Sequence, residues 1–312
     1  MKKLLLATAA STLIATSALS AAHEINIGII LGFTGPIESL VADMGPAEQF
    51  AFDEVNESGL LLGGKTIVTI VGDSTCIDSA AATAVAEKQI TADNVAAIVG
   101  ADCSGVTGAI VSNVAVPNGV VMISPSATSP GLSTIDDNGL FFRTAPSDAR
   151  QGAVMADVLN DKGITEVAVT YTNNDYGKGL ADAFEASFKA IGGTITISAA
   201  HEDGKADYSA EIGALAAAGG EMLAVFGYAD QGGKGIIQSA LDTDAFDVFL
   251  LGDGMKSLTL TEAIGPDLDG SIGTQPGSAG EGAKMLIALL EGVVGHPDGP
   301  FTAESYDAAA LI

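Results

Sequence analysis

The chain has 312 residues, of which 47% are hydrophobic and 17% are charged, so it is a folded protein long enough for two packed domains. Its 39 Asp and Glu against 13 Lys and Arg give a formal charge of −26, which excludes binding to nucleic acid or to anionic membrane surfaces. With 39 Gly, 10 Pro and no Trp, the composition indicates many short elements joined by tight turns.

The N-terminus has the pattern of a secretory signal peptide. Lys2 and Lys3 precede an apolar stretch from Leu4 to Ala22 that ends in small residues, and we expect cleavage after Ala22. Loss of the two lysines changes the formal charge to about −28. An uncleaved anchor is the alternative, but the Ser and Thr residues within the stretch and the lack of a stop-transfer cluster favour cleavage.

The export signal determines what is expected of the two cysteines. Because an exported chain enters an oxidising compartment, we expect Cys76 and Cys103 to form a disulfide. The alternative is a pair of unpaired core thiols. Neither cysteine belongs to a CxxC pair and no Cys/His cluster has ligand spacing, so we expect no metal and no cofactor.

From Ile25 onward, short β-rich runs alternate with helical patterns, and the alternation occurs twice. The first run predicts strands at Ile25–Gly32, Thr66–Gly72, Val95–Val99 and Val120–Ser124, with helices at Gly45–Glu57, Ser79–Thr91 and Val106–Val116. The second predicts strands at Glu166–Thr172, Thr194–Ala200, Met222–Phe226 and Val248–Leu251, with helices at Gly177–Ile191, Tyr208–Ala218 and Gly233–Leu241. The expected fold class is α/β, with two doubly wound parallel-sheet lobes.

Two joins are expected between the lobes. One lies near Phe141–Pro146, before a helix at Asp148–Lys162, and the other lies at Gly270–Gly277. Helical stretches at Gly282–Glu291 and Ala303–Ile312 follow without a strand, so this tail is expected to return to the first lobe. The predicted division is a leader at 1–22, lobe 1 at 23–143 plus 275–312, and lobe 2 at 144–274. Since no helix-stop signal follows Ile312, we expect the C-terminus to be truncated.

Motifs for catalysis are weak. Gly59–Thr66 matches GxxxxGK[ST], but a helix precedes it and a strand follows, which is the reverse of a phosphate-binding loop. His23, His201 and His296 are expected at the surface, and no GxSxG or HExxH motif is present. These observations favour a binding protein over an enzyme.

The turns after the strands supply candidate ligand contacts, because ligands of parallel α/β sheets bind beyond the carboxyl ends of the strands. Ser104 is predicted to cap a helix and to offer a carboxylate its hydroxyl beside free amides, although capping alone is the simpler interpretation. Ser126 and Thr128 lie in a rigid turn between two prolines. In the second lobe, Tyr176, Tyr228 and Asp253 follow strands. Hydroxyls facing a carboxylate and two rings match a small zwitterion.

Several of these stretches together resemble the periplasmic substrate-binding proteins of branched-chain amino-acid ABC transporters, which have the type I periplasmic-binding fold. The resembling segments are Gly32–Pro36, Ala47–Asn56 with Gly63–Lys65, Asp73–Cys76, Gly100–Ser104, Ile123–Thr128, Asn174–Gly179 and Glu304–Ala308.

The resemblance implies a role for each candidate. Ser104, Ser126 and Thr128 would hold the ligand carboxylate, and Thr128 and Asp253 its ammonium, with Tyr176 and Tyr228 covering the ligand. It also implies the Cys76–Cys103 disulfide. Leu40 stands where some relatives present an aromatic residue.

The sequence therefore predicts a monomeric periplasmic receptor that closes on a small amino acid and delivers it to an ABC transporter permease. A sensor for amides or small carboxylates on the same fold is the alternative, and an extracytoplasmic enzyme is the third class.

Overall fold

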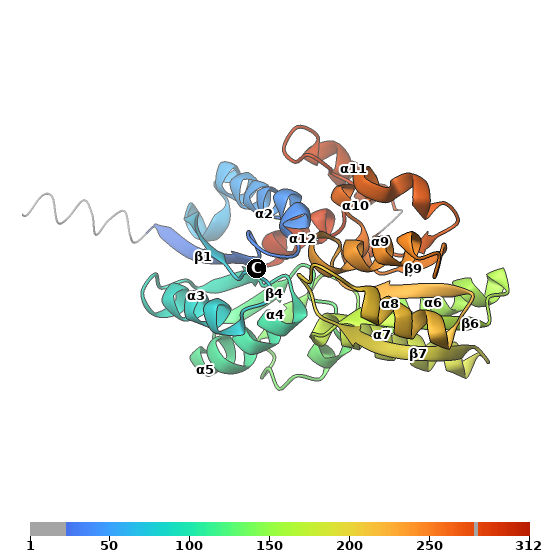
Figure 1. Cartoon of the computed structure of the whole chain (residues 1–312). Helices are drawn as coiled ribbons and strands as arrows, with labels where there is room; N and C mark the ends of the chain where they lie inside the picture. The colour runs from blue at the N-terminus through green and yellow to red at the C-terminus, as the bar shows by residue number, and fades with distance from the viewer. Residues whose placement is uncertain (1–22, 278–279) are drawn as a thin grey trace, which may run out of the picture.

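The computed structural model describes residues 23–277 and 280–312 and contains two parallel five-stranded sheets, each in its own lobe (Figure 1). The first has the order β2-β1-β3-β4-β5 and the second β10-β9-β8-β6-β7. Counted from its own first strand, each sheet has the order 2-1-3-4-5, a doubly wound arrangement. The predicted fold class of two doubly wound lobes is confirmed. The expected signal peptide lies outside the described residues.

The eight strands predicted from the sequence agree with the observed strands to within two residues at each end. The first sheet contains β1 (Glu24–Leu31), β2 (Thr66–Asp73), β3 (Ala97–Gly100), β4 (Val121–Ser124) and β5 (Phe141–Arg143). The second contains β6 (Glu166–Thr172), β7 (Thr194–His201), β8 (Met222–Phe226), β9 (Phe249–Leu251) and β10 (Ile272–Gly273). All five residues of β8 are buried, as expected for a central strand covered on both faces.

The helices connect these strands. They are α2 (Glu38–Ser58), α3 (Ser79–Thr91), α4 (Ser104–Ile110), α5 (Val116–Asn118), α6 (Asp148–Lys162), α7 (Asp175–Ala190), α8 (Ser209–Ala218), α9 (Lys234–Asp242), α10 (Leu258–Ile264), α11 (Glu281–Leu290) and α12 (Thr302–Leu311). A π-helical segment at Val111–Ala115 joins α4 to α5, and a second one, η4 (Ala229–Gly233), precedes α9.

The structure differs from the sequence prediction at four elements, one of which is α10, a helix that was not predicted. Both joins contain short strands, β5 and β10, whose three and two residues are too few to show alternation. Helix α2 begins seven residues before the predicted start and continues through Pro46. Proline in a helix removes one backbone hydrogen bond, but Val41 and Met44 before it are buried in the lobe 1 core, and their burial offsets that loss.

The tail lies against the first lobe, where α12 packs on α2 (Figure 1). The Tyr306 hydroxyl donates to Glu54 Oε2 at 2.6 Å, and Asp43 Oδ1 accepts from the amides of Gly295 and His296 at 2.7 and 3.2 Å. These contacts agree with a tail that returns to lobe 1. The exact lobe boundaries stay a prediction.

The predicted Cys76–Cys103 disulfide is confirmed, and it joins the turn after β2 to the residue before α4. The prediction that His201 lies at the surface is wrong, because its side chain is buried between the hydroxyls of Thr170 and Thr172. Within residues 23–277 and 280–312, no helix combines the length and apolar character that a membrane span requires.

Candidate ligand-binding site

The predicted site residues lie where the carboxyl ends of the two sheets face each other. The segments after β1 and β3 in lobe 1 and after β6 and β8 in lobe 2 flank the point at which the strand order of each sheet reverses. At such a switch point, adjacent connections leave toward opposite faces and open a crevice. A small cavity lies between these segments.

This cavity encloses about 20 Å³ of free volume, room for about one water molecule. Five of the six predicted residues line it: Ser104, Ser126, Tyr176, Tyr228 and Asp253. The sixth, Thr128, is fully buried next to the cavity without lining it. The two lobes are therefore closed on each other, and a ligand larger than water requires them to separate before it enters.

Ser104 does not cap its helix, contrary to the prediction. Helix α4 begins at Ser104 and its N-cap residue is Cys103, which makes no side-chain cap. The Ser104 hydroxyl instead accepts the Ser129 amide at 3.1 Å. A hydroxyl that accepts one hydrogen bond keeps its own proton for another partner. Ser104 can therefore donate to a ligand carboxylate.

The turn that carries Ser126 and Thr128 is fixed by Arg143, which the sequence prediction missed. The Arg143 guanidinium donates to the carbonyls of Ala127 and Ser129, both at 2.9 Å. Ser126 donates its hydroxyl to the Asp102 carbonyl at 3.1 Å, so its oxygen remains as an acceptor. The Thr128 hydroxyl has no hydrogen-bond partner among the described residues.

In lobe 2, two tyrosines and Asp253 form one compact group. The Tyr176 hydroxyl donates to Asp253 Oδ1 and accepts the Gly254 amide, both at 3.0 Å. The rings of Tyr176 and Tyr228 stack with centroids 5.2 Å apart. A Cβ at position 254 would lie 2.6 Å from the Gly227 carbonyl oxygen, so a glycine there permits the close approach of the two turns.

Asp148 is a buried carboxylate, repelled by Asp253, that sequence reasoning did not single out. It is fully buried in the first turn of α6, and neither of its carboxylate oxygens has a hydrogen-bond partner in the described part of the chain. Burial and then repulsion by Asp253 raise its pKa well above the usual value, while the positive charge of Arg143 opposes that rise. Burial also raises the pKa of Asp253, and its hydrogen bond from Tyr176 opposes the rise.

Two buried carboxyls thus repel each other, one of which, Asp253, lines the cavity, and Arg143 is the cation that interacts with Asp148. Arg143 only partly compensates them, because its own hydrogen bonds go to carbonyls and to Ser133 Oγ. Unpaired buried carboxylates are costly. An ammonium group near both side chains would relieve their repulsion and give the Asp148 carboxylate a partner.

Lobe 1 contributes a third buried carboxylate, Asp102, whose oxygens are occupied by hydrogen bonds to the turns around the cavity. Asp102 accepts the amides of Gly32 and Cys103 and the Ser74 hydroxyl, so it ties together the turns after β1, β2 and β3. Burial raises its pKa and these hydrogen bonds oppose the rise. Glu48 in α2 is also fully buried. Burial, and to a lesser extent repulsion from Asp102, raises the pKa of Glu48 well above the usual value.

The remaining wall of the cavity is apolar. It consists of Ile37, Leu40, Met44 and Phe301, from the start of α2 and from the residue before α12. Phe301 has a φ of 62°, a left-handed conformation that is strained for an aromatic residue. This wall can bury an aliphatic side chain but offers a second carboxylate or ammonium no partner.

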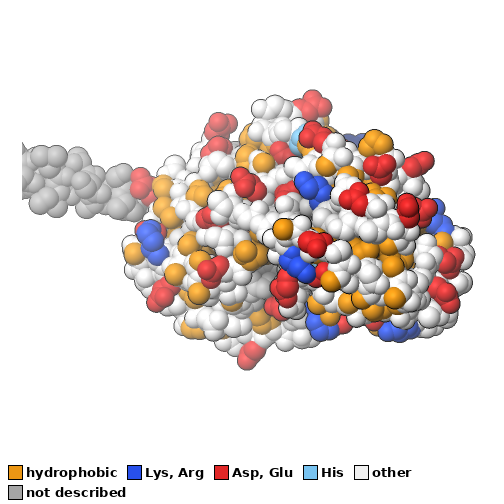
Figure 2. Space-filling view, in the orientation of Figure 1, with side chains coloured by type: hydrophobic (Ala, Val, Ile, Leu, Met, Phe, Trp, Pro, Cys, Tyr) orange, Lys and Arg blue, Asp and Glu red, His pale blue; other side chains and the backbone are white. Residues whose placement is uncertain are grey.

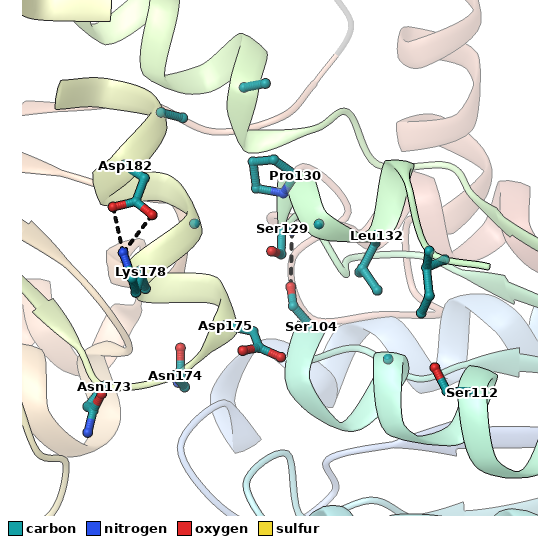
Figure 3. A pocket seen from close by; sticks show the side chains of 16 residues that line it. Ser104, Ser112, Ser129, Pro130, Leu132, Asn173, Asn174, Asp175, Lys178 and Asp182 are labelled. Carbon is teal, nitrogen blue, oxygen red and sulfur yellow. Dashed lines mark hydrogen bonds and ion pairs between the residues drawn. The ribbon is translucent and has the colours of Figure 1, made fainter. Parts of the chain in front are cut away.

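A larger hollow between the lobes, about 900 Å³, lies between α4 and α7 (Figure 3). Its one Lys, Lys178, pairs with Asp182 at 2.6 Å on the same helix. Ser104 borders both spaces, and its bond to Ser129 is drawn in Figure 3. Because the buried unpaired carboxylates lie elsewhere, the small cavity is the better candidate for a charged ligand.

Within the described ranges, no three His, Cys, Asp or Glu side chains are grouped so that they could hold a metal ion. On the face shown in Figure 2, acidic side chains are spread widely and Lys and Arg are few. No basic patch compensates the formal charge of −26 on that face.

Comparison with known proteins identifies the class. Residues 43–251 match the family described as the receptor family ligand binding region, and the chain belongs to this family. It is 32% identical over 303 residues to a Leu/Ile/Val-binding protein homolog of Brucella melitensis, covering 94% of this chain and 79% of that protein.

Solved structures agree. The leucine-binding protein LivK of Thermotoga maritima has a TM-score of 0.81 at 25% identity, with 91% of this chain and 80% of that chain covered. LivJ of Streptococcus pneumoniae, in complex with isoleucine, has a TM-score of 0.78 at 26% identity, with 92% and 82% covered. These findings confirm the resemblance to branched-chain amino-acid binding proteins and the type I periplasmic-binding fold.

The same fold also holds other ligands. A solute-binding protein of Rhodopseudomonas palustris in complex with 4-hydroxybenzoate has a TM-score of 0.76 at 20% identity, covering 92% of this chain and 79% of that chain. At this identity the likeness concerns the fold alone. The ligand class of this chain must therefore be argued from its own side chains.

Proposed function

We propose that this protein is an extracytoplasmic receptor that binds an aliphatic amino acid between its lobes and delivers it to an ABC transporter permease. The observation that carries the proposal is the pair Asp148 and Asp253, both buried and repelling each other. A ligand with an ammonium group stabilises this pair, whereas a plain carboxylate adds a third negative charge.

The other end of the ligand has matching groups in lobe 1. Ser104 retains a proton to donate, and the hydroxyl of Thr128 lacks a partner within the described structure. The apolar residues Ile37, Leu40 and Phe301 accommodate an aliphatic side chain. Tyr176 and Tyr228 exclude water from the ionic groups, which strengthens their interactions.

Calorimetric titration of the purified protein tests this assignment. Leucine, isoleucine and valine are compared with 4-methylpentanoate, which is leucine without its ammonium group, and with 4-hydroxybenzoate. We expect binding of at least one of the three amino acids and no binding of either plain carboxylate at the same concentrations. Binding of 4-methylpentanoate as tight as that of leucine would exclude an ammonium site.

Location and partner form the second half of the proposal. The Cys76–Cys103 disulfide supports an oxidising compartment, here the periplasm. Fractionation of cells producing the full chain should place it in the periplasmic fraction. Copurification with a kinase or transcriptional regulator, and not with a permease, would support the sensor alternative. Recovery of chemically unchanged amino acid from the complex would speak against an enzyme.

A further inference from the structure

Helix α2 lacks an N-terminal cap from its own segment. Its N-cap residue, Ile37, makes no side-chain hydrogen bond, and the first amides of a helix have no partner inside the helix. The Ser39 amide instead donates to Asp230 Oδ2 at 3.4 Å, and the Ser39 hydroxyl donates to the same oxygen at 2.6 Å. Ser39 belongs to the α2 of lobe 1, whereas Asp230 belongs to η4 of lobe 2. A carboxylate of one lobe therefore caps a helix of the other.

The Asp230 carboxylate is held in place by its own lobe. Its second oxygen, Oδ1, accepts the hydroxyls of Ser257 and Thr259 at 3.1 and 2.5 Å. Among the ion pairs of the described residues, none involves Asp230. Its negative charge therefore faces the positive end of the α2 dipole, which favours a carboxylate at that position.

This contact lies outside the small cavity, but the same first turn of α2 contributes to both. Ser39 and Asp230 line a different hollow, of about 510 Å³, and neither lines the small cavity. Ile37 and Leu40, however, flank Ser39 and do line the small cavity. The first turn of α2 thus contacts the ligand space with one side and the opposite lobe with another.

We infer that Asp230 is a positioning residue that latches the closed lobes by capping α2 across the cleft. The cap exists only while the lobes are together, so it stabilises the closed form over the open form. Asp230 thereby sets the affinity and residence time of the ligand without touching it. This inference deepens the proposed function, since the latch acts on binding only if the ligand lies between the lobes.

Rapid-mixing kinetics with leucine test the latch in the full chain. We expect Ser39→Ala and Asp230→Ala each to raise the dissociation rate about tenfold, the loss expected for one cap with a charge-assisted hydrogen bond. The preference among leucine, isoleucine and valine should not change, because neither residue contacts the side chain. The double variant should be no weaker than Asp230→Ala alone.

Asp78→Ala is the matched control, because the Asp78 carboxylate caps α3 within lobe 1 only, through the amides of Ala80 and Ala81. Its dissociation rate should stay within about twofold of the parent's. Ser39→Ala is expected to fold, since alanine is the best helix former and the substitution changes no residue of lobe 2. Unchanged dissociation in Ser39→Ala, or additive effects in the double variant, would overturn the latch.

Failure of the proposed function can be told apart from failure of the latch. If the parent protein binds none of the three amino acids, the proposed function fails, and the latch is judged by small-angle X-ray scattering of the ligand-free proteins. A larger radius of gyration in both Ser39→Ala and Asp230→Ala would support the latch. An unchanged radius in both would overturn it.

Discussion

Replacing Asp148 by Asn is expected to weaken leucine binding by about 2 kcal/mol, or roughly 30-fold. The change keeps the shape of the side chain and removes its charge. It therefore tests whether the buried carboxyl beside Asp253 serves to hold an ammonium group.

The magnitude follows from the surroundings of Asp148. A hydrogen bond to a charged group contributes about 1.5–3 kcal/mol, and full burial of Asp148 places this contact at the upper end of the range. The repulsion between Asp148 and Asp253, however, is also lost in the ligand-free variant. Relief of that repulsion offsets part of the loss and leaves about 2 kcal/mol.

Titration calorimetry of the parent and Asp148→Asn with both leucine and 4-methylpentanoate completes the test. The variant should lose affinity for leucine but not for 4-methylpentanoate, whose binding should stay equal or improve because a repelling charge is gone. Equal leucine affinity in both proteins would refute the ammonium site. A loss of leucine affinity accompanied by a lower urea unfolding midpoint of the ligand-free variant would show that the substitution acts on structure and not on the ammonium contact.

Four further changes have expected outcomes. Asp253→Ala should cost at least about 2 kcal/mol of leucine affinity, since it leaves an ammonium facing one carboxylate; calorimetry showing no change would remove Asp253 from the site. Ser104→Ala should cost about 1–1.5 kcal/mol, measured in the same way, and a larger loss would point to collapse of the Ser129 turn. Reducing the Cys76–Cys103 bond should destabilise the fold by roughly 3–4 kcal/mol for a loop of this length, and an unchanged urea midpoint with and without reductant would contradict that value. His201→Gln tests the buried imidazole: burial lowers the pKa of His201 to about 4, below its usual value near 6.5, so its contribution is complete above pH 6.5 and is lost as the pH falls toward 4. Between pH 7.5 and 5 the parent should lose about 2 kcal/mol of unfolding free energy relative to the variant, and a parallel pH dependence in urea denaturation would show that the ring is not protonated on unfolding.

Periodicity located the sheets well but not their edges. The strand Met222–Phe226 is an unbroken apolar run and was predicted to the residue. Strand β10 has two residues and forms only because β9 lies beside it. Such pairing is a tertiary effect and leaves no pattern in a single sequence.

The residues that line the candidate cavity were predictable where a turn and a strand end coincide, as at Tyr176 and Asp253. Asp148 was not predictable, since an acidic residue in the first turn of a helix usually serves the helix dipole. Gln151, one turn later, donates to Thr274 in the second join, and two polar side chains at this spacing on a helix that follows a lobe join are a signal that could have been used. Asp148 is buried only because the packed structure covers it, and a single sequence carries no local pattern of that burial.

Under the proposed function, the acidic composition and the two buried carboxylates would act together on ligand choice. At a formal charge of −26, the surface disfavours the approach of any anion, but screening over about 8 Å limits this effect to the encounter. Inside the closed cleft, where screening is weak, Asp148 and Asp253 repel the same anions again. A zwitterion escapes both penalties: it has no net charge during approach, and it presents its ammonium to these two carboxylates once bound. Under the proposed function, selection against plain carboxylates would therefore reside in these two side chains, while the surface charge would mainly affect the rate of arrival.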